Sequence, residues 1–313
     1  MQNFWNKIKL VWTDRSLRRK VLFVFFALVI FRLFSAIPIP GIDTVALSRF
    51  LSNNQFFGIL NIFSGGGLSN LSIIMLGVGP YITSSIIMQL LTIMVPALKR
   101  IYHEEGEAGR RRFTQYSRLA TVPLAAIQGF SLLAILENQG ILGELTAFDR
   151  ITNLIVVIAG SILLMWLGEL ISEFGIGNGV SLLIFAGIVS QIPSQVAQLI
   201  FTFDVSQLPL YIMFVVVGVL IIAGVVVVTE AERPIPVTYA KRVRGLKVYG
   251  GGSTYLPLRV NQAGVIPIIF ALSILLFPQM IGAFLSRFSG PIATKVSGVL
   301  LSFSQTSVLY AVL

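Results

Sequence analysis

The sequence contains no cysteine and only one histidine, His103, among its 313 residues. The missing thiols exclude disulfides, thiolate metal sites and cysteine nucleophiles, and a single imidazole excludes any cluster of histidine ligands. Charge is scarce as well, because 12% of the residues are charged whereas a soluble domain carries about 25%. With 55% hydrophobic residues and a mean hydropathy of +0.87, the composition indicates a polytopic membrane protein and not one or two soluble domains.

Long uncharged stretches hold most of the apolar residues. A helix that crosses the hydrocarbon core needs about 20 such residues. Strands of a β-barrel would be only about 9–11 residues long with alternating polarity, and these stretches do not alternate. We therefore predict an all-α helical bundle. The candidate spans are residues 21–37, 71–98, 119–136, 151–168, 180–201, 205–229, 260–286 and 296–313.

The first and last of these stretches need separate comment. Residues 21–37 contain one charge, Arg32, and no small-residue cleavage site follows them. They are therefore interpreted as a retained helix and not as a signal peptide. The last stretch runs into Leu313 without a polar cap, which favours a chain truncated within its eighth helix.

Lysine and arginine are distributed unevenly between the two sides of the predicted bundle. Residues 1–20, 99–118 and 230–259 hold six each, so 18 in all, whereas the loops on the other side hold four. Cytoplasmic loops carry such an excess, so the N-terminus and these basic loops are predicted to be cytoplasmic. The net charge of +10 is thereby explained mainly by orientation in the membrane.

The basic loop 230–259 is longer than orientation alone requires. A strand-like stretch, residues 236–239, precedes the sequence KRVRG at 241–245 and three glycines at 250–252. This pattern predicts a protruding basic hairpin. Such a hairpin suits docking to a large acidic partner, such as ribosomal RNA or an acidic protein surface. The alternative is that its charges only set topology.

Catalytic and ion-coupling patterns are missing from the spans. No Asp or Glu lies deep in residues 71–98, 119–136 or 260–286, which argues against an ion-coupled pump. The run HEEGE at 103–107 lacks the second histidine of a zinc helix. Ser64 has no histidine in any span to activate it. We therefore predict no catalytic residue, no metal site and no cofactor.

Residues 57–95 carry the most informative pattern. The short half-apolar stretch 58–64 cannot cross the membrane, and three glycines follow it. Irregular backbone at membrane depth must be buried in protein or line a cavity, so a re-entrant element is expected. Gly77, Gly79 and Pro80 then permit a kink. Val78 and Ile82 share a helix face, for which ordinary core packing is the alternative explanation.

Several sequence runs, in order and at compatible spacing, resemble the SecY family, the central channel subunit of the Sec protein translocase. The similarity extends from about residue 20 to residue 277. Its runs are IPIPGID (37–43), NIFSGG (61–66), GPYIT (79–83), EGEAGRR (105–111), MWLGE (165–169), GIGNGVS (175–181), YAKR (239–242) and NQAGVIP (261–267).

The resemblance implies a passive channel for unfolded polypeptides, with lateral release of hydrophobic segments into lipid. An aliphatic pore ring would be formed by Val78, Ile82, Ile184 and Ile269. A plug at residues 58–70 would include Gly58, Asn61, Phe63, Ser64, Gly65 and Gly66. A polar cluster at the lateral gate would be formed by Thr83, Gln128 and Asn261. Partner docking would involve Arg110, Arg111, Lys241, Arg242, Arg244 and Lys247.

The family has ten helices in two inverted halves of five. The resemblance therefore implies a tail at 1–20, a complete first half at 21–204 and a partial second half at 205–313, with helices 6–7 and the start of helix 8. The implied partners are SecE-like and SecG-like small membrane subunits, the SecA motor ATPase, the ribosome, polypeptides with signal sequences, and membrane lipid. The implied location is the cytoplasmic (inner) membrane of a prokaryote.

Two other functions remain open at this point. A secondary transporter with inverted repeats also contains broken helices, but it should show buried carboxylates or a polar substrate site. A non-conducting membrane scaffold would need the basic loops and not the pore. A leak of ions through a pore-ring variant would separate the scaffold from the channel.

Overall fold

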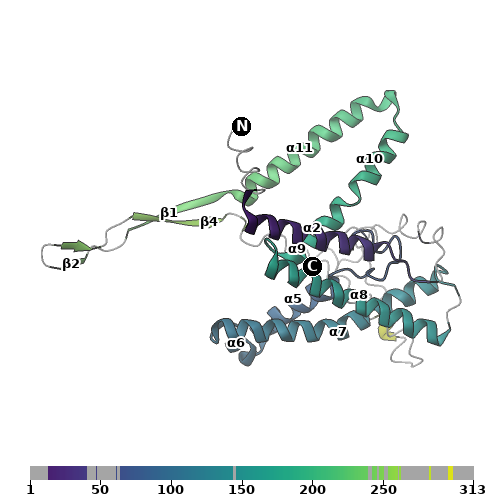
Figure 1. Ribbon diagram of the computed structural model, residues 1–313, viewed down its shortest axis with the longest axis horizontal. Coiled ribbons are helices and arrows are strands. Elements are labelled where there is room, and N and C mark those ends of the chain that lie inside the picture. The colour runs from purple at the N-terminus through teal and green to yellow at the C-terminus, as the bar shows by residue number, and fades with distance from the viewer. Residues whose placement is uncertain are drawn as a thin grey trace. The chain divides into compact units, whose positions relative to one another are not determined.

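A computed structural model describes residues 13–40, 47, 61, 64–143, 146–238, 242–244, 247–249, 253–259, 261, 282 and 295–298 (Figure 1). The chain divides into two compact units. The first comprises Met1–Val196 with Leu272–Leu313, and the second comprises Ala197–Ala271. Most described residues are helical, which confirms the predicted helical class.

The helices of the first unit are α2 (Arg15–Ser35), α5 (Gly79–Met94), α6 (Pro96–His103), α7 (Gly106–Asn138), α8 (Ala147–Phe174) and α9 (Gly179–Val189). Side chains that accept hydrogen bonds from first-turn N–H groups fix where three of them begin. Asp14 caps α2, and Asn178 caps α9. Thr146 and Asp149 form a capping box at the start of α8.

The apolar stretch 71–98 forms a shorter helix than its length suggests. Residues 64–78 are turns, and α5 begins only at Gly79 with Pro80 in its first turn. Gly77 has a φ of 60°, which a helix cannot contain. At the other end, Val95 is extended before Pro96, and α6 turns away from α5 by 110°. The residue before a proline avoids the helical region, which explains the break.

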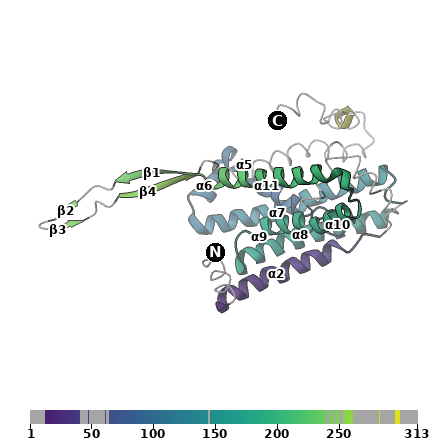
Figure 2. The ribbon, with the colours of Figure 1, turned by 90° about the horizontal axis from the view of Figure 1, so that it is seen from above.

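An ion pair at each end joins α7 to α8. Nε of Arg118 lies 2.6 Å from Oε1 of Glu169, and Arg150 pairs with Glu137 at the opposite end. Figure 2 shows the two helices running alongside each other. Because both contacts are charge-assisted, they fix the alignment of the two helices while the apolar residues between them form the core.

Four helical segments of the described residues are long and apolar enough to cross a membrane. The bent pair of α5 and α6 makes a fifth if it is counted as one span. The four are Gly106–Glu137, Ala147–Phe174, Gly179–Phe201 and Leu208–Glu230. Helix α2 covers the predicted first span, but the basic residues Arg15, Arg18, Arg19, Lys20 and Arg32 exclude it from this set. The predicted spans 260–286 and 296–313 lie almost entirely outside the described residues.

The second unit begins within α10 (Ile192–Phe201) and continues through the 3-10 turn η1 (Val205–Gln207) and α11 (Leu208–Glu230). No residue of α11 is buried, although nearly all of its side chains are apolar, as lipid contact requires. Before η1, hydrogen bonds from the hydroxyl and backbone N–H of Ser206 hold the pKa of Asp204 below its ordinary value.

A two-stranded ribbon follows α11. Strand β1 (Glu232–Thr238) pairs with β4 (Ser253–Arg259), and β2 (Arg242–Arg244) pairs with β3 (Lys247–Tyr249), both antiparallel. The two ladders share one register, so they belong to a single hairpin (Figure 1). Only two residues separate Arg244 from Lys247, and the first is glycine. The hairpin expected for this loop is therefore present.

Candidate functional site

Residues 64–78 form an irregular segment inside the first unit. Most of these residues are buried, except for the exposed Ser69 and Asn70 and the half-buried Ile73, and backbone hydrogen bonds hold the segment in place. The N–H of Ile73 donates to the carbonyl of Ile37 at 3.1 Å, and the N–H of Ile39 donates to that of Leu71 at 2.9 Å. This burial satisfies the requirement for non-helical backbone at membrane depth. The re-entrant element expected at residues 58–67 lies partly outside the described residues and stays a prediction.

Three of the four predicted ring residues belong to one apolar cluster. Val78 is buried at the N-cap of α5, and Ile82 lies one turn later. Ile184 comes from α9, about 100 positions further along the chain. All three pack into a cluster whose buried members are Ala27, Phe31, Ile74, Val78, Leu164, Leu167, Ile171 and Leu183. Ile269 lies outside the described residues.

The predicted plug residues are described only in part. Gly58 and Phe63 lie outside the described residues. Asn61 accepts at its carbonyl from the N–H of Gly66 at 2.9 Å, and its side-chain oxygen accepts from the N–H of Ser69 at 2.8 Å. Ser64 is buried, and its hydroxyl donates to the carbonyl of Asn61 at 3.1 Å. These contacts connect Asn61 to residues 64–69.

The predicted lateral-gate residues come from both units. Thr83 and Gln128 are buried in α5 and α7, within the first unit. The hydroxyl of Thr83 donates to the carbonyl of Gly79 in its own helix at 3.0 Å. Asn261 is half-buried and belongs to the second unit. Their shared role at a gate stays a prediction.

A glycine that the sequence argument did not use positions the irregular segment. A Cβ atom on Gly160 of α8 would lie 2.0 Å from the carbonyl oxygen of Ile73. Only a residue without a side chain allows the helix and the segment to approach so closely. The sequence offers one weak signal for this contact, a small residue in an otherwise bulky apolar stretch.

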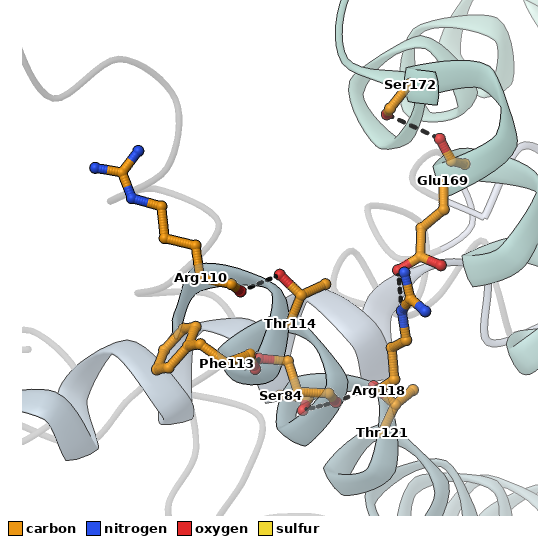
Figure 3. Close-up of polar contacts among 10 residues, drawn as sticks. Ser84, Arg110, Phe113, Thr114, Arg118, Thr121, Glu169 and Ser172 are labelled. Carbon is orange, nitrogen blue, oxygen red and sulfur yellow. Dashed lines mark hydrogen bonds and ion pairs between the residues drawn. The ribbon is translucent and has the colours of Figure 1, made fainter. Parts of the chain in front are cut away.

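Helices α5 and α7 meet through buried hydroxyl groups (Figure 3). Oγ of Ser84 donates to the carbonyl of Ser117 at 2.6 Å, and Oγ1 of Thr121 donates to the same carbonyl at 2.8 Å. All three residues are buried. The bond from Ser84 joins the two helices, as hydrogen bonds between membrane helices do, whereas the bond from Thr121 lies within α7. They fix the part of α7 that follows the basic residues at its start.

The basic residues at the start of α7 lie on a tight corner. Gly106 has a φ of 63°, and a Cβ atom on Gly109 would lie 2.0 Å from the carbonyl oxygen of Ile101. Arg111 forms an exposed ion pair with Glu107 at 3.0 Å. Arg110 is exposed, and Figure 3 shows its side chain extending away from the Arg118–Glu169 pair. Arg110 is therefore accessible, and its role in partner docking stays a prediction.

The second predicted docking surface is the tip of the ribbon. Arg242 is opposite Tyr249, and Arg244 is opposite Lys247. Alternate residues of a strand share a face, so the register puts the positions of these four residues on one face of the ladder. Lys241 lies outside the described residues.

The Arg118–Glu169 pair gives a first testable prediction. Glu169→Gln should lower the free energy of unfolding by about 1 kcal/mol, because Arg118 would lose a charge-assisted partner that is only partly exposed. Thermal unfolding of the purified chain in detergent measures this change. Glu173→Gln on the same helix is the matched control, because Glu173 is exposed. Equal stability of the two variants would show that the pair contributes nothing.

Comparison with protein families matches residues 72–313 to the SecY family. A protein translocase subunit SecY from Corynebacterium glutamicum is 41% identical over 281 residues, which cover 86% of this chain and 63% of the relative. The subunit from Mycobacterium leprae is 40% identical over 88% of this chain and 64% of its own length. That from a Buchnera aphidicola subspecies is 44% identical over 88% and 79%. The chain thus spans less than two thirds of the first two relatives.

Solved structures match the fold. A structure described as that of a protein-conducting channel superposes with a TM-score of 0.59 at 23% identity, over 89% of this chain and 61% of the other. A second concerns the plug domain of a SecY protein, which is stated to stabilise the closed state, and superposes with a TM-score of 0.60 at 22% identity over the same shares. The family match covers most of the sequence, and the fold agrees with it: the chain belongs to the SecY family.

Proposed function

We propose that this chain forms the central part of a protein-conducting channel, which passes unfolded polypeptides across the membrane and releases hydrophobic segments laterally into lipid. The observation that carries the proposal is the apolar cluster. Val78 and Ile82 from the start of α5 and Ile184 from α9 pack into it, where the buried segment 64–78 ends. The names of the relatives, protein translocase subunit SecY, support the same function.

The chemistry of the cluster suits a constriction. The predicted ring members Val78, Ile82 and Ile184 are aliphatic and the rest of the cluster is apolar, so a narrow passage between them would exclude water and ions. Their flexible side chains would still close around a moving polypeptide. Ile269 would complete the ring, and residues 58–70 would block the passage as a plug. Thr83, Gln128 and Asn261 would line the lateral gate, where weak hydrogen bonds allow opening.

The secondary transporter receives less support from the described spans. Glu137 and Glu169 are carboxylates at the ends of α7 and α8, and an arginine pairs with each of them. An ion-coupling carboxylate must be able to bind and release its ion during transport. These two carboxylates instead hold neighbouring helices together, which favours a passive channel. We further propose that the chain is not an enzyme and that its partners supply the energy for transport.

The charges suggest where those partners bind. The excess of lysine and arginine in residues 1–20, 99–118 and 230–259 supports a cytoplasmic N-terminus in the inner membrane of a prokaryote. Arg110 and Arg111 at the α7 corner, and Lys241, Arg242, Arg244 and Lys247 in the ribbon, would contact the ribosome or the SecA motor. A solved relative carries the description of a ribosome–channel complex from the endoplasmic reticulum. SecE-like and SecG-like subunits would pack against the helices from the lipid side.

Single cysteines test the conducting path, since the chain has none of its own. A precursor polypeptide arrested during transport, carrying a thiol-reactive crosslinker, should react with Ile82→Cys and Ile184→Cys. Phe26→Cys is the matched control, because Phe26 is 63% exposed and does not belong to the cluster. Crosslinks at Phe26→Cys without any at Ile82→Cys would reduce the cluster to ordinary core packing.

A further inference from the structure

Arg32 is the only charged residue within the apolar stretch 21–37, and it lies in the last turn of α2. Its Nη1 atom donates to the carbonyl oxygen of Gly65 at 3.0 Å and to Oγ of Ser190 at 3.3 Å. Gly65 belongs to the irregular segment 64–78, and Ser190 is the C-cap of α9. One guanidinium therefore connects two helix ends with the segment between them.

The groups that accept hydrogen bonds from Arg32 are a backbone carbonyl and a hydroxyl, not a carboxylate. The ion pairs found in the described part of the chain do not include Arg32. Ser190 lies at the C-terminal end of α9, where the helix dipole is negative and favours a cation. Its hydroxyl donates in turn to the carbonyl of Gly187 at 2.8 Å. The site that holds the cation therefore exists only while the segment and the end of α9 lie together.

The segment fits closely where Arg32 holds it. Gly65 has a φ of 70°, and a Cβ atom on it would lie 2.6 Å from Cζ of Phe31 and 3.0 Å from Cα of Gly187. Its carbonyl also lies 3.4 Å from Oγ of Ser35, the last residue of α2, which donates to it. Arg32 and Ser35 of α2 thus both donate to the carbonyl of Gly65, at a position where the neighbouring atoms leave no room for a side chain.

A second donor on the α9 side holds the same segment. Nε2 of Gln191 donates to the carbonyl of Asn61 at 3.4 Å. Arg32 therefore holds Gly65, and Gln191 holds Asn61, which itself bonds to Gly66 and Ser69. Both attachments use backbone carbonyls, so they do not depend on which side chains the segment carries.

We propose that Arg32 is the latch of the closed channel. By donating to Gly65 and Ser190, it holds the segment 64–78 against α2 and α9, and the channel opens when these bonds break. The inference rests on the proposed channel function. The guanidinium remains partly exposed, so its bonds exchange readily with water and each adds modest stability. Bonds of this strength keep the segment in place in the resting channel and break when a polypeptide enters.

Thiol labelling measures the latch directly. Ser64 is 2% exposed, so Ser64→Cys reports when the segment moves away. In membranes that contain the full 313-residue chain, adding Arg32→Gln should raise the labelling rate of Ser64→Cys about three- to tenfold, as the loss of one or two hydrogen bonds predicts. Ser35→Ala should raise it less. Arg19→Gln, which removes a charge elsewhere on α2, is the matched control and should leave the rate unchanged.

A second reporter separates the latch from general loosening. Ser117 is buried between α5 and α7, away from the segment, and labelling of Ser117→Cys should not respond to Arg32→Gln. An unchanged rate at Ser64→Cys, or an equal increase at both reporters, would overturn the latch. Labelling requires no transport, so either result leaves the channel proposal intact. Failure of the precursor crosslinks would instead overturn the proposed channel function, and the contacts of Arg32 would then only stabilise the fold.

Discussion

Gly160→Ala is expected to separate α8 from the segment that precedes α5. The added Cβ atom would lie 2.0 Å from the carbonyl oxygen and 2.8 Å from the carbonyl carbon of Ile73. Both are backbone atoms, so no side-chain rotation relieves the clash, and the helix has to shift. Overpacking of this kind costs about 1–3 kcal/mol, and a backbone obstacle places the change at the upper end of that range.

Two measurements detect the expected shift of α8 in the Gly160→Ala variant. Thermal unfolding in detergent should show a midpoint lower by about 6–12 °C, since each kcal/mol shifts Tm by about 2–4 °C in a chain of this order of size. The labelling rate of Ser64→Cys should rise, because Ile73 anchors the same segment. Gly218→Ala is the matched control. Gly218 lies in α11, and no heavy atom of the described structure lies within 4 Å of the position of its Cβ. Equal midpoints for the two variants would contradict the close approach at Gly160.

The helices were predictable because hydropathy and charge act locally. The spans that became α7, α8 and α11 follow from uncharged length, and the ribbon follows from strand-like residues and a glycine turn. The start of α5 was not predictable from hydropathy. Residues 71–78 are as apolar as the helix after them, since a segment buried in protein and a span in lipid select the same side chains.

Most of the structural features that could not be predicted from the sequence are contacts between residues far apart in the chain. Arg118 and Glu169 are 51 positions apart, and Arg32 and Gly65 are 33 positions apart. Neither separation along the sequence corresponds to a helical or strand period, so no periodic pattern in the sequence indicates these pairs. Carbonyl partners are especially hard to foresee, because every residue has a carbonyl. The resemblance correctly indicated the family, whereas the roles of the ring and gate residues stay predictions until the cysteine experiments are done.

Reversing two charges near the tip of the ribbon is expected to have the largest effect on partner binding. Residues 230–259 hold six basic and two acidic residues. Arg242→Glu with Arg244→Glu changes this loop from a net charge of +4 to zero. Arginine contacts to phosphate or carboxylate are charge-assisted and often bidentate. The loss of two such contacts should weaken binding of the ribosome or the motor about 100-fold.

The salt dependence of binding identifies the physical cause. If the two arginines contact phosphates, the variant should also show a shallower dependence of affinity on salt, because fewer counterions are released. Arg242→Lys with Arg244→Lys is the matched control. It keeps the charge and loses the planar fork, so its affinity should fall between those of the two other chains. Binding titrations of the purified chains against ribosomes and against the motor, at two salt concentrations, measure all three.

Orientation in the membrane has to be checked in the same variants. Four basic residues remain in the loop after the charge reversal, so the positive-inside bias should still hold the ribbon on the cytoplasmic side. A cysteine at Ser253 should therefore stay unreactive toward an impermeant thiol reagent added from outside. With that orientation confirmed, undiminished affinity for both partners would mean that Arg242 and Arg244 only set topology. The register holds these basic positions on one face of the ribbon, where a single large surface can contact them together. A loss of affinity for one partner alone would therefore identify that partner as the one that docks on the ribbon.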